Sequence, residues 1–359
     1  MRAVVRRGPK LVCTDIADPE PGVGQVLVKT LACGICGSDL HALHHLEHMV
    51  ETAKRSGAGD TIDPKQDLVM GHEFCAEILD YGPGSGRPFK VGARVLSIPY
   101  AFGPEGAELI GFSTRFNGGF AERLLLAEPL LLEVPNGLSS ELATLVEPLS
   151  VGAHAVAKAG LTGRSVALVV GCGPIGLAVI IALKARGAGP IIATDFSPVR
   201  RALAEKLGAD IVIDPAETSP HGHWSGFDVP ATLGEFSSAS LSGRTMRDAV
   251  IFECVGVPGM LQSLIDKAPP TAHIVVIGAC MEEDRIDPVV AINKQLRLSF
   301  VFAYSPEEFG QTLFELAEGR FDASPLLTGS VGLAGVAEAF QALRDAEAHV
   351  KIIVRPDQV

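Results

Sequence analysis

The segment VALVVGCGPIGLAVIIALKARGAGPIIATD, residues 166–195, decides the fold. An uninterrupted apolar run at 166–170 leads directly into the glycine-rich stretch GCGPIG at 171–176. An apolar helical pattern then runs to about residue 186, and a second β-branched run ends at Asp195. Strand, glycine-rich turn, helix and strand in this order predict a βαβ unit with parallel strands.

The same alternation continues toward the C-terminus. A helix is predicted at 198–207, and strands are predicted at 211–214, 249–255 and 273–279. Strands that alternate with helices indicate a doubly wound parallel sheet with helices on both faces. The polar stretch from Pro215 to Asp248 has weak periodicity, and we expect a long surface excursion there.

The glycine-rich turn is typical of dinucleotide sites. Its glycines let the backbone turn tightly and approach a pyrophosphate, whose charge then lies at a helix N-terminus. Asp195, at the end of the next strand, is placed to accept hydrogen bonds from ribose hydroxyls and would repel a 2′-phosphate. The sequence therefore favours NAD over NADP, although Arg200 and Arg201 keep NADP open and Asp195 could instead cap the next helix.

The coenzyme candidates are the loop residues, the acid, a nearby arginine and the ends of two later strands. They are Gly171, Gly173, Pro174, Ile175, Gly176, Asp195, Arg200, Val255, Gly256 and Gly278.

Outside this region the pattern is β-rich. Strands are predicted at 3–6, 25–30 and 74–80, with one helix from Leu40 to about Arg55. After Gln295 the sequence predicts a strand, helices near 307–318 and 336–343, and a last strand at 351–354. The fold class is therefore α/β, with a β-rich domain at 1–154 and 294–359 and a coenzyme domain at 155–293.

Composition bounds the function. The chain has 359 residues, 47% hydrophobic, with a formal net charge of −12. Such a charge repels nucleic acid and anionic membranes, so neither partner is expected. Seven scattered cysteines indicate free thiols, and because no apolar run of signal or membrane-spanning length occurs, we expect a cytoplasmic protein.

Three further motifs carry metal-ligand chemistry. CGICGSDLH at 33–41, GHE at 71–73 and VEPLSVGAHA at 146–155 supply a thiol, an imidazole and a carboxylate, which are all suitable zinc ligands. Together with GCGPIG, these motifs resemble the zinc-containing medium-chain dehydrogenase/reductase family, which includes alcohol, sorbitol and threonine dehydrogenases. The resemblance covers nearly the whole chain.

The resemblance implies a GroES-like catalytic domain, an inserted Rossmann domain and a catalytic zinc. By motif match, Cys36 and His72 are metal ligands, and Glu147 matches the branch that uses an acid as the third protein ligand. Glu73 lies beside His72 and, in the family, can approach the metal. Asp39 is placed to accept a hydrogen bond from a ligand imidazole and to orient it.

Ser38 and His41 occupy the family's proton-relay positions. Such a relay carries the proton of the alcohol away while hydride passes to the nicotinamide. A helix cap for Ser38 and a solvent-facing position for His41 are the alternatives.

The sequence departs from the family in two places. Many relatives carry a four-cysteine structural zinc lobe in the stretch that corresponds to 92–119, which contains no cysteine here, so one zinc per chain is predicted. An insertion at 43–65 contains His44, His45 and His48, which could form a second metal site, although we expect a solvated helix face. We expect the insertion as a whole to shape the substrate pocket or a subunit contact. A homodimer or homotetramer is expected from the family.

The leading functional prediction is an NAD-dependent zinc alcohol dehydrogenase acting on a secondary, polyol-like or aromatic alcohol. A sugar or polyol dehydrogenase and a zinc-free quinone or enone reductase are alternatives within the enzyme class. A catalytically silent NAD-binding protein is the alternative from outside it.

Overall fold

A computed structural model describes residues 1–104, 106–135 and 137–358 and divides them into two compact units. The first unit comprises Met1–Glu147 and Phe309–Val359, and the second comprises Pro148–Glu308. The predicted domains change at 154/155 and 293/294. The two units change at 147/148 and 308/309 instead. The strand β16 (Arg297–Phe300) pairs in parallel with β15 (His273–Val276) and so belongs to the sheet of the second unit.

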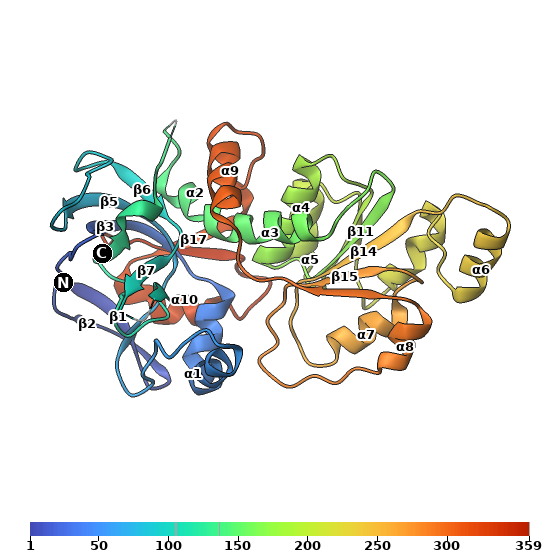
Figure 1. Cartoon of the computed structure of the whole chain (residues 1–359), viewed down its shortest axis with the longest axis horizontal. Helices are drawn as coiled ribbons and strands as arrows, with labels where there is room; N and C mark the ends of the chain where they lie inside the picture. Colours follow the sequence, from blue (N-terminus) through green and yellow to red (C-terminus); the bar gives the residue numbers. More distant parts are fainter. Residues whose placement is uncertain (105, 136, 359) are drawn as a thin grey trace. The chain divides into compact units, whose positions relative to one another are not determined.

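The second unit is built on a parallel sheet with strand order β13-β12-β11-β14-β15-β16. In Figure 1, α4 and α5 cover one face of this sheet, and α7 and α8 cover the other. Its remaining strands are β11 (Ser165–Val170), β12 (Ile191–Thr194), β13 (Ile211–Ile213), β14 (Asp248–Glu253) and β15 (His273–Val276). Its helices are α3 (Val146–Lys158), which begins in the first unit, α4 (Pro174–Ala185), α5 (Pro198–Leu207), η2 (Pro220–Phe227), α6 (Leu233–Leu241), α7 (Met260–Lys267) and α8 (Pro288–Asn293).

The stretch at 215–248 differs from the expected surface excursion. It contains the 3₁₀ helix η2 and the helix α6, and the indole of Trp224 is only 1% exposed. Trp224 packs into the apolar core that β11 forms with α7. The polar composition of the segment does not reveal that it is anchored to the core, because the single ring of Trp224 supplies much of its apolar contact.

The first unit contains a mixed sheet with strand order β10-β6-β5-β3-β18-β17, to which β9 adds by pairing with β3, a small sheet β2-β1-β4 and the hairpin β7-β8. Its strands are β1 (Arg2–Arg7), β2 (Lys10–Asp15), β3 (Gln25–Gly34), β4 (Leu68–Val69), β5 (Glu73–Tyr81), β6 (Arg94–Ser97), β7 (Tyr100–Gly103), β8 (Gly106–Leu109), β9 (Arg123–Ala127), β10 (Leu131–Glu133), β17 (Leu327–Val331) and β18 (Lys351–Val354). Its helices are α1 (Gly37–Ser56), η1 (Glu128–Leu130), α2 (Ser140–Thr144), α9 (Pro306–Ala317), which begins in the second unit, η3 (Ser324–Leu326), η4 (Leu333–Gly335) and α10 (Val336–Ala342).

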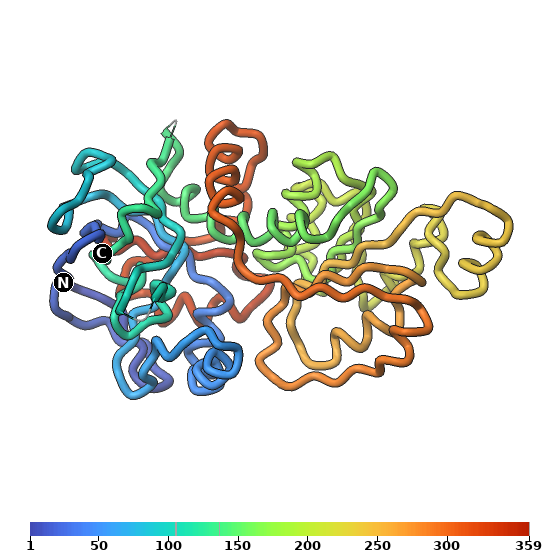
Figure 2. The backbone as a smooth tube through the Cα atoms, in the orientation of Figure 1, coloured from blue at the N-terminus to red at the C-terminus, as the bar shows by residue number. Residues whose placement is uncertain are grey.

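The end of the chain completes the first unit. The trace in Figure 2 brings the C-terminal segment back among the N-terminal strands, where β18 pairs antiparallel with β3. Residues more than 300 positions apart, such as Val354 and Cys33, therefore face each other in the sheet.

Helix α1 is the long helix of the first unit. It begins directly after Cys36, and it ends at Gly57, whose φ of 78° lies in the left-handed region that glycine adopts without strain. Its interior is interrupted at His45, where φ is −126°. The histidine-rich segment is thus helical as predicted, although the helix starts three residues before Leu40.

Candidate metal centre and coenzyme site

A thiol, an imidazole and a carboxylate meet in the first unit. Cys36, His72 and Glu73 each offer a ligand atom, and these atoms lie within 4.8 Å of one another. The sheet explains why, since β3 and β5 pair antiparallel with Gly34 opposite Glu73. The turn that follows β3 therefore lies beside the residues that start β5.

The donor set fits a zinc ion. His72 is 7% exposed, and its buried Nδ1 has no hydrogen-bond partner, because Asp39 Oδ1 lies 3.6 Å away. Burial alone lowers the pKa of His72, but Asp39 and Cys36 together raise it well above its usual value. A thiolate, an imidazole and a carboxylate at close range are what Zn²⁺ binds, and such an ion would remove the need for a proton on the imidazole.

Asp39 holds the two ligand-bearing loops together. It is fully buried, and its Oδ2 accepts a hydrogen bond from the backbone N–H of Cys36 at 2.9 Å. Its Oδ1 accepts from the N–H of Gly71 at 3.4 Å and lies near the His72 ring. The carboxylate therefore fixes the start of α1 and the approach to His72 at once.

Glu73 has a buried partner that the sequence did not reveal. Lys351 Nζ donates to both carboxylate oxygens of Glu73 at 2.7 Å and to the carbonyl of Ile35 at 3.0 Å. The side chains of Glu73 and Lys351 are 0% and 1% exposed. Burial lowers the pKa of Lys351, but Glu73, together with Cys36 and Glu147, raises it overall, as expected for a charged pair with Glu73. A lysine at the start of the otherwise apolar strand KIIV was the available signal in the sequence.

Glu147 is half-buried in the first turn of α3. Burial raises the pKa of Tyr100, and the charge of Glu147 raises it further, whereas His72 lowers it. Glu147 also adds to the raised pKa of Lys351. The charge of Glu147 therefore shifts the pKa of Tyr100 and Lys351, which Cys36, His72 or Glu73 also shift. Glu147 itself does not belong to the group of ligand atoms within 4.8 Å of one another.

The proposed relay residues lie at the start of the same helix as the thiol ligand. Ser38 and His41 are half-buried in the first two turns of α1. Burial lowers the pKa of His41, and His45 lowers it further, which favours a neutral imidazole able to accept a proton.

The glycine-rich loop of the second unit leaves room for a ligand. A Cβ on Gly176 would meet the carbonyl oxygen of Gly171 at 1.8 Å, so packing of helix against strand demands glycine there. Gly173 differs, because a Cβ would meet no atom nearer than 3.9 Å and its φ of −70° suits any residue. Nothing in the protein requires glycine at this position, which fits a pyrophosphate that approaches the N-terminus of α4.

Asp195 ties the ends of β12 and the glycine-rich loop together. Its Oδ2 accepts from the N–H of Cys172 at 2.7 Å, and its Oδ1 accepts from the N–H of Ser197 at 2.8 Å. The cap of α5 is Ser197, which accepts from the N–H of Arg200. The carboxylate therefore lies at the glycine-rich loop, and Ser197, two residues later, caps α5 in its place.

Glu253 is a second functional candidate that the sequence did not reveal. It ends β14 at 2% exposure, and its Oε1 accepts from the N–H groups of Val255 and Gly256 at 2.7 and 2.8 Å. Its carbonyl accepts from the N–H groups of Ile277 and Gly278. One buried residue thus shapes both loops that carry the predicted nicotinamide contacts.

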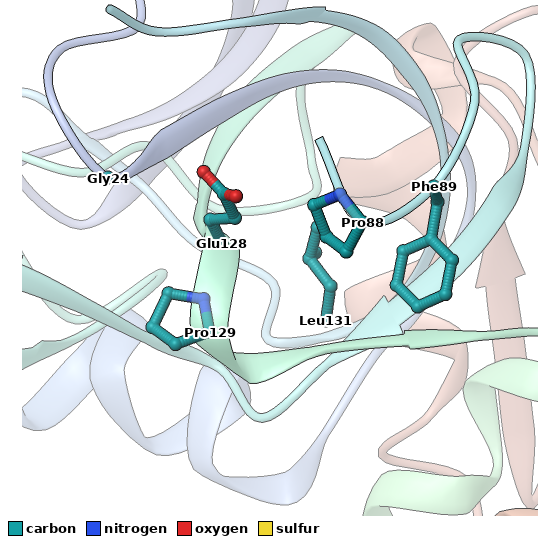
Figure 3. Close-up of a pocket in the computed structure, with 6 residues that line it drawn as sticks. All are labelled: Gly24, Pro88, Phe89, Glu128, Pro129 and Leu131. Carbon is teal, nitrogen blue, oxygen red and sulfur yellow. The ribbon is translucent and has the colours of Figure 1, made fainter. Parts of the chain in front are cut away.

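An open pocket of about 390 Å³ lies elsewhere in the first unit (Figure 3). It is lined by Gly24, Pro88, Phe89, Glu128, Pro129 and Leu131. The Glu128 carboxylate is already engaged by the N–H of Gly86 at 2.9 Å. This pocket offers no set of catalytic groups.

Comparison with known proteins agrees with this chemistry. Residues 22–136 match the alcohol dehydrogenase GroES-like domain, and residues 174–318 match the zinc-binding dehydrogenase domain. (R,R)-butanediol dehydrogenase of Bacillus subtilis is 35% identical over 351 residues, covering 95% of both chains. The chain belongs to the zinc-containing medium-chain dehydrogenase/reductase family. The predicted resemblance and fold class are confirmed, and the protein is an alcohol dehydrogenase-like enzyme.

Further members of this family are similar over most of their length. Sorbitol dehydrogenase of Bos taurus is 29% identical, covering 90% of this chain and 87% of its own. The crystal structure of 2R,3R-butanediol dehydrogenase from Bacillus subtilis superposes with a TM-score of 0.78 at 32% identity, with 99% of each chain covered. Across the described ranges, this dehydrogenase has no helix long and apolar enough to cross a membrane.

Proposed function

We propose that this dehydrogenase oxidises a small secondary alcohol that carries a neighbouring hydroxyl, with NAD as the hydride acceptor and one zinc ion at Cys36 and His72. The convergence of Cys36, His72 and Glu73 carries this proposal. The names of its relatives, butanediol and sorbitol dehydrogenase, support a diol or polyol over an aromatic alcohol.

Glu147 is our choice for the third protein ligand. Glu73 is the nearer carboxylate, but Lys351 occupies both of its oxygens. A buried charged pair resists separation, because the freed carboxylate would lose its counter-charge in a low-dielectric interior. The influence of Glu147 on Tyr100 and Lys351 supports its presence in the same neighbourhood.

The bound groups would supply Lewis acidity at the substrate oxygen and a hydride acceptor at the nicotinamide. The protein's own residues orient the metal ligands and accept the proton of the alcohol. Asp39 orients His72, while Ser38 relays the proton that the alcohol releases and the neutral imidazole of His41 accepts it. Glu253 holds the loops with Val255, Gly256 and Gly278 in the shape that would receive the nicotinamide.

NAD is proposed over NADP. A 2′-phosphate needs a cation close by, whereas the end of β12 is followed by the carboxylate of Asp195 and the exposed ring of Phe196. Arg201 is engaged by Asp214 at 2.9 Å and by two backbone carbonyls. Arg200 remains for the ribose or pyrophosphate, since its Nη1 would lie 3.9 Å from a Cβ on Gly173.

An assay tests the whole proposal. NAD reduction is followed by absorbance with 2,3-butanediol stereoisomers, sorbitol, threonine and benzyl alcohol, each with and without a zinc chelator. We expect the diols to be the best substrates and the chelator to abolish turnover. Activity that survives chelation would favour a zinc-free reductase, and coenzyme binding without turnover of any alcohol would favour a silent NAD-binding protein.

A single zinc per chain is proposed because the stretch at 92–119 has no cysteine and contains side-chain contacts that connect its own parts. Glu108, 4% exposed, accepts a hydrogen bond from Ser113 Oγ at 2.6 Å and lies 3.2 Å from Arg115 Nε. These contacts join the hairpin β7-β8 to the loop that follows it. Elemental analysis is expected to return one equivalent of zinc per chain, and two equivalents would contradict the proposal.

A homodimer through the edge of the parallel sheet is proposed as the assembly. Among the described strands, β16 pairs with β15 alone, so its other edge offers unpaired backbone groups. Phe300 and Phe302 are 72% and 80% exposed there, and Ile292 of α8 is 70% exposed. An edge strand that pairs antiparallel with its own copy satisfies a twofold axis.

This assembly predicts the effect of charge on the edge. The double substitution of Phe300 and Phe302 by aspartate is expected to convert the dimer to a monomer, because two like charges would face their own copies. Light scattering coupled to size exclusion measures the mass. As a control, Phe314→Asp alters a phenylalanine that is 46% exposed on α9 and should leave the mass unchanged. A wild-type monomer would contradict the assembly.

A further inference from the structure

The loop between α1 and β4, residues 57–67, is hydrogen-bonded to a second loop of the first unit. Thr61 Oγ1 donates to the backbone carbonyl of Phe112 at 3.0 Å. The carbonyl of Thr61 in turn accepts from the backbone N–H of Thr114 at 3.0 Å and from its hydroxyl at 3.3 Å. Phe112 and Thr114 belong to the loop between β8 and β9, residues 110–122. These hydrogen bonds therefore join the α1–β4 loop to the β8–β9 loop.

The α1–β4 loop is held on both sides of Thr61. Before it, Asp60 Oδ2 lies 2.8 Å from Lys54 Nζ in the last turn of α1. After it, the half-buried side chain of Ile62 packs against the apolar core of the first unit. This part of the loop falls within the inserted segment at 43–65. The insertion therefore makes an anchored contact with the β8–β9 loop that the family motifs do not imply.

The β8–β9 loop carries Phe112 to a metal ligand. Phe112 is 7% exposed, and its ring centroid lies 5.4 Å from that of His72, with 53° between the two planes. This distance is in the range of favourable aromatic pairs. The N–H of Gly119 donates to the carbonyl of Gly71 at 2.7 Å, and a Cβ on Gly111 would lie 3.0 Å from the same oxygen. The loop thus contacts both the His72 ring and the backbone directly before it.

Packing helps to orient the His72 imidazole, because its hydrogen bonding is incomplete. Its buried Nδ1 has no hydrogen-bond partner, since Asp39 Oδ1 lies 3.6 Å away. The orientation of the ring therefore depends on the atoms packed against it as well as on the charge of Asp39. Loss of a contact that orients a metal-binding imidazole typically weakens metal binding about 10- to 100-fold.

We propose that the α1–β4 loop positions the zinc ligand His72, with Thr61 as the positioning residue and Phe112 as the link between them. This inference rests on the proposed zinc site at Cys36 and His72. Without the hydroxyl of Thr61, the backbone at Phe112 loses a bond that ties it to the α1–β4 loop, and the ring against His72 can shift. The imidazole then holds zinc less firmly. The inserted segment is thereby assigned a role at the metal centre.

The rate of zinc release tests the proposal. Zinc-loaded enzyme is mixed with excess pyridylazoresorcinol, a dye whose absorbance changes when it takes up zinc. Thr61→Val removes the hydroxyl at nearly constant side-chain volume and is expected to release zinc about tenfold faster than the wild type. Thr61→Ser keeps the hydroxyl and should release zinc at the wild-type rate. Equal rates in Thr61→Val and the wild type would overturn the proposal.

Two phenylalanines of the β8–β9 loop form a matched pair. Phe112 and Phe116 are 7% and 5% exposed, and both belong to the apolar core of the first unit. Among the described residues, the ring of His72 pairs with Phe112 and not with Phe116. Phe112→Leu and Phe116→Leu should therefore lower Tm by similar amounts, while only Phe112→Leu speeds zinc release, by about tenfold. Equal acceleration in both variants would indicate a general loosening of the core and would overturn the proposal.

Cobalt substitution reads the ligand geometry without an activity measurement. The visible absorption of bound Co²⁺ depends on how its ligands are arranged. Thr61→Val is expected to shift these absorption bands. Ser56→Ala should match the wild type, since Ser56 lies in the same insertion but donates to the carbonyl of Ala53 in its own helix. Identical cobalt spectra in Thr61→Val and the wild type would overturn the proposal.

The wild type separates this inference from the proposed function. A wild-type enzyme that holds no zinc would overturn the proposed function and this inference together. A wild-type enzyme that holds zinc, with the same release rate or the same cobalt spectrum in Thr61→Val, would overturn only the role of the α1–β4 loop.

Discussion

Replacing Lys351 with methionine is expected to lower the free energy of unfolding by about 3–5 kcal/mol. The substitution leaves the carboxylate of Glu73, which is 0% exposed, without the ammonium that holds both of its oxygens. An uncompensated buried charge is among the few single changes with an effect of this size. Urea unfolding followed by circular dichroism measures the loss.

Two further variants isolate the pair. Removing both charges, as Lys351→Met with Glu73→Gln, is expected to recover most of the lost stability, because no ion then remains buried. Lys54→Met removes an ammonium that lies 2.8 Å from Asp60 at the surface, where about 1 kcal/mol or less is expected. If Lys351→Met and Lys54→Met lower the free energy of unfolding equally, Glu73 and Lys351 do not form a buried ion pair.

Local patterns predicted most of the fold. The predictions were correct for the strand at 166–170, the glycine-rich turn and the helix after it. Each of these elements packs against one that lies within a few residues of it in the sequence, so local patterns are enough to predict it. The helix at Pro198–Leu207 and the strand at Lys351–Val354 have the predicted bounds. The prediction of a surface excursion around Trp224 was wrong, because the order of this segment comes from packing against β11 and α7 rather than from its own periodicity.

The site shows the same division. Cys36 and His72 were predicted from motifs, and the pairing of β3 with β5 brings them together. Lys351 could not be assigned to Glu73 from the sequence, since 278 residues separate the partners and only the return of β18 to β3 joins them. His44 and Arg344 likewise meet only through tertiary packing.

The strongest effect on activity is expected at the thiol ligand. Cys36→Ala removes a donor from the set that holds the metal, and a zinc ion contributes several kcal/mol of transition-state stabilisation. A loss of about 4 kcal/mol corresponds to a fall in kcat/KM of about 10³-fold. Zinc content should fall in parallel, whereas thermal stability of the second unit and its affinity for NAD should be retained, because the glycine-rich loop lies in a different unit.

Cys33→Ala is the matched control three residues earlier. Cys33 is buried in the apolar core of the first unit, and burial, with Asp39 and Glu73, raises the pKa of its thiol well above the usual value, so it stays a neutral thiol. We expect Cys33→Ala to keep its zinc and to change kcat/KM by less than about threefold, since Cys33 does not belong to the group of Cys36, His72 and Glu73 whose ligand atoms converge. Equal losses of zinc and activity in the two variants would show that disturbance of the local fold, and not loss of a ligand, explains the effect at Cys36.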